Sequence, residues 1–212
     1  MSPRHVVLAL VALLVPIASA AQDSGLTLDV AAGYQDLTSA SNSAKAVFDG
    51  SSGGISYGGG LRYVFGNGFY IGGFVRYFSR DGERVFVASP GGEVFRLGHP
   101  LSLRLIPVHG TLGWRFGQGF LRPYVGGGAG VTSYREESMV GGVTESASET
   151  KVSAHLLGGL EFGRGSLRFA TEAMWTTVPD SLGVGGVSQV YDESDLGGLS
   201  IVGKVMFNVG GR

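Results

Sequence analysis

Two strands joined by a short turn are predicted by the stretch Leu112-Gly113-Trp114-Arg115-Phe116-Gly117-Gln118-Gly119-Phe120-Leu121-Arg122-Pro123-Tyr124-Val125. Bulky apolar side chains alternate with other residues on either side of its Gly-x-Gly turn, and a period of two is the pattern of a β-strand. Glycine supplies the positive φ angles that a tight hairpin needs. The same turn recurs at Gly66-Asn67-Gly68 and Gly163-Arg164-Gly165. The repetition predicts a protein built from hairpins.

Segments of alternating hydrophobicity continue along the chain on both sides of this hairpin. Eight are expected to form strands: 26–34, 55–65, 69–80, 102–116, 120–133, 152–162, 166–176 and 199–209. In the fourth, the apolar side chains change from odd to even positions near Ile106-Pro107. Because proline cannot donate to a β-ladder, this change of phase predicts a β-bulge.

The connections between the eight segments alternate in length. Long ones cover residues 35–54, 81–101, 134–151 and 177–198, and the three Gly-x-Gly turns lie between them. Transmembrane β-barrels have this order, with short periplasmic turns, longer extracellular loops and an even number of strands. We therefore expect an all-β fold, an eight-stranded antiparallel up-and-down transmembrane β-barrel, in the outer membrane of a Gram-negative bacterium.

The face opposite to the apolar one distinguishes a membrane barrel from a soluble one. It is rich in glycine, at Gly58, Gly60, Gly72, Gly126, Gly128, Gly130 and Gly159. Small residues suit the narrow interior of an eight-stranded barrel, whereas an exposed glycine row would weaken a soluble sheet. The apolar face is therefore expected to contact lipid. The expected partners are the bilayer and its lipopolysaccharide, and a soluble barrel is the less favoured alternative.

Composition excludes several classes of protein. The 212 residues include 38 glycines and no cysteine, so disulfide frameworks and cysteine-based metal sites are ruled out. The net charge is −1 for the whole chain. Residues 1–20 contain one arginine and no acid, so removing them leaves 15 basic against 17 acidic residues, a net charge of −2. Nucleic acid, which requires a basic surface, is not an expected partner.

Residues 1–20 are predicted to be a cleaved signal peptide, and residues 21–212 the barrel domain. Arg4 and His5 precede an apolar run at 6–17, and Ala18-Ser19-Ala20 follows as a cleavage site. The run is shorter than the roughly 20 apolar residues of a membrane-spanning helix. Cleavage is expected after Ala20 or Ala21, and no further domain is expected after the last strand.

One stretch also resembles a known family. Leu121-Arg122-Pro123-Tyr124-Val125-Gly126-Gly127-Gly128-Ala129-Gly130-Val131 is similar to the signature strand of the outer-membrane protein β-barrel domain family. Ile106-Pro107-Val108 and Gly113-Trp114-Arg115-Phe116-Gly117 follow the same pattern. The family comprises small eight-stranded barrels like the transmembrane domain of OmpA and the opacity-type surface proteins. The resemblance implies this fold over residues 22–212 and implies no single activity.

Charged residues on the glycine-rich face are the first candidates for function: Asp29, Arg62, Arg76, Arg122, Glu161, Arg168, Glu172 and Lys204. Their levels along the strands predict three pairs, Glu161 with Arg168, Asp29 with Arg62, and Glu172 with Lys204. Buried charges need partners, and eight strands leave room only for side chains. We therefore expect interior ion pairs that plug the lumen. The alternative is a narrow, porin-like channel for small solutes.

Ser153, His155 and Glu172 are the second candidates, because an acyl hydrolase needs a nucleophile, a base and an orienting acid. His109 and Thr111 point the same way. These side chains are expected to face the lumen, whereas a lipid substrate arrives from outside the barrel. No catalytic residue and no cofactor is therefore assigned, and a lipid-modifying enzyme is the least favoured alternative.

The long connections are the third candidates. They hold 13 acids against 6 bases, His99 being counted among the bases, and the acids are Asp36, Asp49, Asp81, Glu83, Glu93, Glu136, Glu137, Glu145, Glu149, Asp180, Asp192, Glu193 and Asp195. The run 192–195 could ligate Ca²⁺ or Mg²⁺ through carboxylates, but its spacing is not that of an EF-hand, so no metal site is assigned. The pattern of residues 85–95 predicts a hairpin. We expect it to extend the barrel wall, and contact with a partner is the less favoured alternative. The expected role is structural or surface interaction, with the loops recognising an extracellular ligand or surface.

Overall fold

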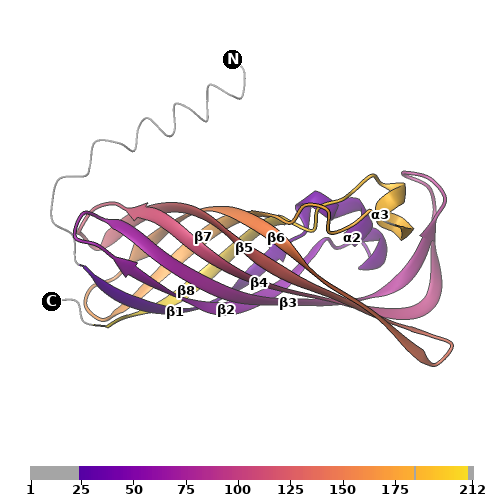
Figure 1. The fold of residues 1–212 in the computed structure, drawn as a ribbon, viewed down its shortest axis with the longest axis horizontal. Coiled ribbons are helices and arrows are strands. Elements are labelled where there is room, and N and C mark those ends of the chain that lie inside the picture. Colours follow the sequence, from indigo (N-terminus) through magenta and orange to yellow (C-terminus); the bar gives the residue numbers. More distant parts are fainter. Residues whose placement is uncertain (1–23, 184, 210–212) are drawn as a thin grey trace, which may run out of the picture.

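A closed antiparallel barrel is formed by residues 24–183 and 185–209, which a computed structural model describes without the side chain of Val140. Each strand pairs with the next, and the last pairs with the first. The strands are β1 (Gly25–Asp36), β2 (Gly53–Val64), β3 (Phe69–Val87), β4 (Val94–Arg115), β5 (Leu121–Val140), β6 (Val143–Phe162), β7 (Leu167–Thr177) and β8 (Gly198–Val209). The predicted fold class is confirmed (Figure 1). The predicted signal peptide, residues 1–20, lies outside the described residues.

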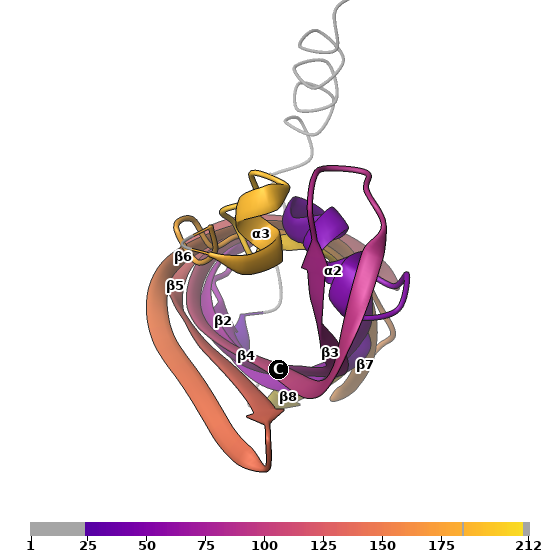
Figure 2. The ribbon, with the colours of Figure 1, turned by 90° about the vertical axis from the view of Figure 1, so that its right-hand side faces the viewer.

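The two ends of the barrel differ. At one, the turn end, the three short turns use glycine at positive φ, including Gly68 at 88° and Gly117 at 76°. At the other, the cap end, the β1–β2 connection forms η1 (Thr38–Ala40) and α2 (Ser41–Val47), and the β7–β8 connection contains α3 (Gly186–Val190). These short helices lie over the mouth of the barrel (Figure 2). In the described part of the chain, no helix has the length and apolarity needed to cross a membrane.

Strands β3 to β6 are longer than predicted and continue beyond the ends of the other four (Figure 1). The connections 81–101 and 134–151, expected to be loops, are therefore mostly strand. Pairs such as Phe86 with Phe95 and Glu137 with Ser146 continue the ladders to their turns. The hairpin predicted over residues 85–95 is confirmed as an extension of the barrel wall. The second hairpin escaped prediction because both its faces are polar, which removes the apolar period that marks a strand.

The β-bulge predicted at Ile106-Pro107 is wrong. The pairing of β4 with β3 keeps one register from Trp114 to Pro100. Its irregularity lies beyond this stretch, where Glu83 pairs with Pro100 but Val85 pairs with Arg96. The pairing of β4 with β5 is also continuous over residues 101–115. The backbone alternation of β4 stays regular, and what changes along the strand is the polarity of the surroundings on its inner and outer faces.

Apolar side chains cover the outside of the barrel near the turn end and fill its inside near the cap end. The outer band includes Leu28, Val30, Ile55, Leu61, Ile71, Val75, Ile106, Val108, Leu112, Val131, Leu156, Leu160, Phe169 and Ile201, all exposed. The inner group, here called the cap core, comprises Leu37, Ala44, Phe48, Phe78, Leu101, Leu103, Leu105, Val178 and Leu196, all buried. Strand β4 contributes to both surfaces, and this explains the change of phase in its sequence.

Aromatic rings line the outer surface at the turn end. Tyr63, Phe65, Phe69 and Trp114 form a continuous row, with neighbouring ring centroids 5.0, 5.7 and 5.4 Å apart. Phe162 of β6 stacks on Phe169 of β7 at the same end of the barrel. Such girdles mark the level at which a barrel wall meets the polar surface of a bilayer.

Candidate functional site: the barrel interior and the cap

Four arginines surround one buried glutamate near the turn end. The Glu161 carboxylate pairs with Arg62, with Arg122 at 2.9 Å, with Arg168 at 3.0 Å and with Arg115 at 3.7 Å. The glutamate side chain is 0% exposed. We call these five residues the turn-side cluster. The predicted pair of Glu161 with Arg168 is confirmed.

The Arg62 guanidinium also lies over two aromatic rings. Its central carbon is 5.4 Å from the ring centroid of Tyr70 and 5.0 Å from that of Tyr124. Cation–π contacts of this kind stabilise a positive charge inside a protein. The prediction that Arg62 pairs with Asp29 is wrong, because Arg62 reaches across the interior to Glu161 on β6.

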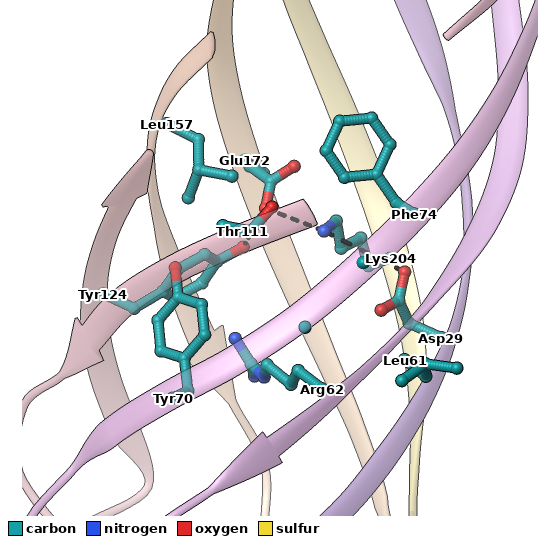
Figure 3. Close-up of a pocket in the computed structure, with 12 residues that line it drawn as sticks. Asp29, Leu61, Arg62, Tyr70, Phe74, Thr111, Tyr124, Leu157, Glu172 and Lys204 are labelled. Atoms are coloured by element: carbon teal, nitrogen blue, oxygen red, sulfur yellow. Dashed lines mark hydrogen bonds and ion pairs between the residues drawn. The ribbon is translucent and has the colours of Figure 1, made fainter. Parts of the chain in front are cut away.

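A second group of charges, the mid-barrel cluster, centres on Glu172 (Figure 3). Its carboxylate accepts hydrogen bonds from Arg76 at 2.6 Å, Lys204 at 2.7 Å and the Tyr124 hydroxyl at 3.0 Å. Lys204 also lies 3.9 Å from Asp29. The predicted pair of Glu172 with Lys204 is confirmed, and Lys204 takes the place predicted for Arg62 beside Asp29.

The space between the two clusters is small. A cavity of about 30 Å³ is lined by residues of both, including Arg62, Tyr70, Tyr124, Glu172 and Lys204. A water molecule occupies at least about 10–15 Å³ on this measure, so the cavity has room for about one or two waters.

A histidine cluster lies next along the interior toward the cap. The Nδ1 atoms of His109 and His155 are 2.9 Å apart, so one donates to the other, and the rings are stacked. His109 Nε2 is 2.6 Å from Ser153 Oγ, and His155 Nε2 is 3.0 Å from Thr111 Oγ1. Ser153 also hydrogen-bonds to Thr132, at 2.9 Å.

The structure does not assemble the triad considered from the sequence. Ser153 is hydrogen-bonded to His109, not to His155, and the Glu172 carboxylate is occupied by Arg76, Lys204 and Tyr124. Ser153 is 1% exposed and His109 3% exposed. The serine and the histidines are thus buried and hydrogen-bonded to one another and to neighbouring threonines in a polar interior.

The cap is tied down by two acids from the β7–β8 connection. Glu193 accepts hydrogen bonds from the backbone N–H groups of Asn42 and Ser43, both at 2.9 Å, at the start of α2. Asp195 accepts from the Thr177 hydroxyl and from the backbone N–H of Val178. Two of the three carboxylates in the run 192–195, those of Glu193 and Asp195, thus hold backbone in place. Within residues 24–183 and 185–209, no group of three or more His, Cys, Asp or Glu side chains could hold a metal ion.

Tyr134 closes the side of the cap core. Its hydroxyl donates to Glu136 at 2.7 Å, and the ring packs against the cap core. Burial raises the pKa of the Tyr134 phenol above its ordinary value, and the hydrogen bond to Glu136 raises that pKa further. The hydroxyl therefore remains a donor at neutral pH.

Several interior residues were missed in the sequence, although the signal was there. Arg115 shares the phase of His109 and Thr111 on β4, and Tyr124 shares the phase of Arg122 on β5. The alternation that assigned the predicted charges to the interior would have assigned these as well. Glu193 and its contacts with α2 could not be predicted, because the two segments are 150 residues apart.

The chain has the fold of the eight-stranded outer-membrane β-barrels. Neisserial surface protein A (NspA) matches it with a TM-score of 0.53 at 13% identity, over 87% of this chain and 96% of that one. The N-terminal β-barrel domain of Pseudomonas aeruginosa OprF gives 0.48 at 13% identity, over 89% and 100%. Ail, the attachment invasion locus protein of Yersinia pestis, in complex with the heparin analogue sucrose octasulfate, gives 0.47 at 16% identity, over 87% and 98%. No family model and no curated protein matches the sequence.

The similarity to NspA confirms, at the level of the fold, the resemblance drawn from the stretch 121–131. The exposed apolar band is the outer surface that the predicted location in the outer membrane of a Gram-negative bacterium requires.

Proposed function

We propose that this protein is a non-conducting outer-membrane protein that presents a folded extracellular cap for structural or surface-interaction roles. The signal peptide at residues 1–20 delivers it to the membrane, the eight strands anchor it, and the cap end faces outward. Ion pairs and hydrogen bonds inside the barrel hold the wall together, and no enzymatic activity is assigned to the interior residues.

The observation that carries this proposal is the filled interior. Two buried glutamates, Glu161 and Glu172, together bind six cationic side chains that come from strands β2, β3, β4, β5, β7 and β8. Charges that are paired and hydrogen-bonded across a barrel cannot separate without leaving a partner unsatisfied in a medium of low dielectric constant. Beyond them, the cap core adds an apolar layer on the side of the extracellular mouth.

Conductance in planar lipid bilayers tests the closed lumen. The refolded protein without residues 1–20 is expected to give no current steps. Arg76→Ala and Glu172→Ala each break the mid-barrel cluster and are expected to give measurable steps, since the remaining charges attract water. Glu145→Ala, which removes an exposed pair with Arg84, serves as the silent control. Steady conductance of the unmodified protein would establish the porin-like channel instead.

Glu193 is expected to control the cap without affecting the barrel. Glu193→Ala removes the acceptor from the start of α2, so α2 should open locally more often. A charge-assisted hydrogen bond contributes roughly 1.5–3 kcal/mol, which corresponds to about tenfold or more in the open population. Trypsin cleavage after the exposed Lys45 of α2 measures this population in detergent micelles. A rate equal to that of unmodified protein and of Glu145→Ala would contradict the assigned role of Glu193.

A further inference from the structure

Two arginines lie side by side on the outer surface of the barrel wall. Arg104 of β4 is directly opposite Arg135 of β5, and their side chains are 44% and 53% exposed. Like charges directly opposite each other destabilise an antiparallel pair. One carboxylate is shared between them, since Glu137 lies 2.7 Å from Arg135 and 3.5 Å from Arg104. One positive charge of this trio is therefore left without compensation by Glu137.

The arginine pair lies at the boundary of the outer apolar band. On the outer face of β4, Arg104 is followed by Ile106 and Val108, and on that of β5 Arg135 follows Ser133 and Val131. Ile106, Val108 and Val131 belong to the exposed apolar band. Residues two apart on one face are about 7 Å apart along a strand. In the orientation given by the proposed function, both guanidinium groups stand at the level of the headgroups of the outer leaflet.

The surface is hollowed at this point. A concavity of about 450 Å³ is lined by Tyr77, Arg104, Ile106, Ser133, Arg135, Ser148, Glu149 and Thr150. It therefore offers two guanidinium groups and several hydroxyl donors around its polar part. Glu149 at its edge is compensated by Lys151, 2.8 Å away.

A second, apolar concavity lies on β2, β3 and β4, and it shares β3 and β4 with the first. It measures about 650 Å³ and is lined by residues that include Leu61, Ile71, Gly73, Val75 and Val108. Toward the turn end, the next outward-facing residue after Tyr77 on β3 is Val75, and the next after Ile106 on β4 is Val108. The two hollows are therefore adjacent. The surface is thus cationic at its upper end and apolar toward the middle of the membrane.

We propose that this surface binds one phosphorylated, acylated lipid of the outer leaflet, with a phosphate on Arg104 and Arg135 and an acyl chain over Gly73. The inference rests on the proposed function, because that function places the surface in the bilayer. Arginine binds phosphate through paired N–H donors, and two guanidinium groups on one wall present several. The surplus positive charge selects an anion, and the apolar hollow below it selects the chain attached to that anion.

Native mass spectrometry of the refolded protein in detergent micelles, with added diphosphorylated lipid A, tests the headgroup contacts. Arg104→Gln and Arg135→Gln are each expected to weaken binding about tenfold, because a charge-assisted hydrogen bond to phosphate is lost. Arg164→Gln is the matched control, since Arg164 is exposed in a turn at the opposite end. Unchanged binding by the double variant would overturn the proposal.

Gly110→Val tests the acyl groove. Gly110 lies opposite Gly73 on the ladder, and an added Cβ has no neighbour closer than the Ala129 carbonyl oxygen at 3.9 Å. The variant should therefore fold, and its side chain should cover the groove and weaken lipid A binding several-fold. Lipid A binding that Gly110→Val leaves unchanged, and that inorganic phosphate displaces completely, would indicate a free-anion site and overturn the proposal.

Membrane insertion distinguishes a failure of the proposed function from a failure of the lipid site. Failure of the unmodified protein to insert into lipid vesicles as a heat-modifiable barrel would count against the proposed function itself. A protein that inserts normally but binds no lipid A would overturn only the lipid site.

Discussion

Glu161→Ala is expected to lower the free energy of unfolding of the barrel by about 3–5 kcal/mol, the usual consequence of removing one partner from a buried ion pair. The effect belongs at the upper end of this range. Four arginines contact the one carboxylate, and without it they repel each other inside the turn-side cluster. Urea unfolding in lipid vesicles, followed by tryptophan fluorescence and by heat-modifiable migration, measures the change.

Two variants make this result specific. Glu161→Gln keeps the hydrogen-bond acceptor and removes the charge, so it is expected to lie between Glu161→Ala and the unmodified protein. Glu145→Ala removes a salt bridge whose partners are 39% and 57% exposed, and it should change the unfolding free energy by less than about 1 kcal/mol. Equal stability of Glu161→Ala and Glu145→Ala would mean that the turn-side cluster contributes nothing to the barrel.

Gly128→Val is expected to prevent closure of the β4–β5 ladder. Gly128 faces the interior opposite Thr111, and an added Cβ would overlap the carbonyl oxygen of Gly110. That neighbour is backbone, so it cannot rotate away as a flexible side chain could. The variant should yield little or no heat-modifiable barrel after refolding into detergent or lipid.

Gly110→Val is the matched control for this substitution. Gly110 belongs to the same pair of strands, opposite Ala129, but it faces outward where an added Cβ meets only ordinary contact distances. The same change of residue is thus expected to be tolerated at one position and not at the other. A folded Gly128→Val with the yield of Gly110→Val would show that the wall can separate locally to admit a side chain.

Much of the barrel could be predicted from the sequence because lipid imposes a strict rule on its wall. Where the outside of the wall is apolar and the inside polar, apolar and polar residues alternate along each strand. The Gly-x-Gly turns mark where strands end at the turn end of the barrel. The rule stops at the edge of the membrane. The polar residues of 134–151 continue β5 and β6 without any apolar period, and the apolar side chains of β4 move to the inside at Leu105. The change of phase in β4 therefore marks the edge of the membrane-facing wall and not a bulge.

Interior pairs were predictable only between neighbouring strands. Glu161 with Arg168 and Glu172 with Lys204 lie on adjacent strands at similar levels. Asp29 and Arg62 also lie on adjacent strands, so level along the ladder is needed for such a pair but does not decide it. Arg62 on β2 reaches Glu161 on β6, and this contact depends on side-chain length and on the width of the barrel. The histidine pair joins β4 to β6 in the same way. Alternation assigns a residue to the interior, but it carries no information on contacts across it.

The composition of the cap core has a consequence for the order of folding. Leu37 follows the first strand of the barrel, whereas Val178 and Leu196 lie between the seventh and the eighth. These side chains reach one another only after β8 has paired with β1, when the ends of the ring meet. Contacts so distant in the chain are slow to form. Burial of Leu37 against Leu196 is therefore a late event in assembly, and a probe placed there would report the moment at which the ring closes.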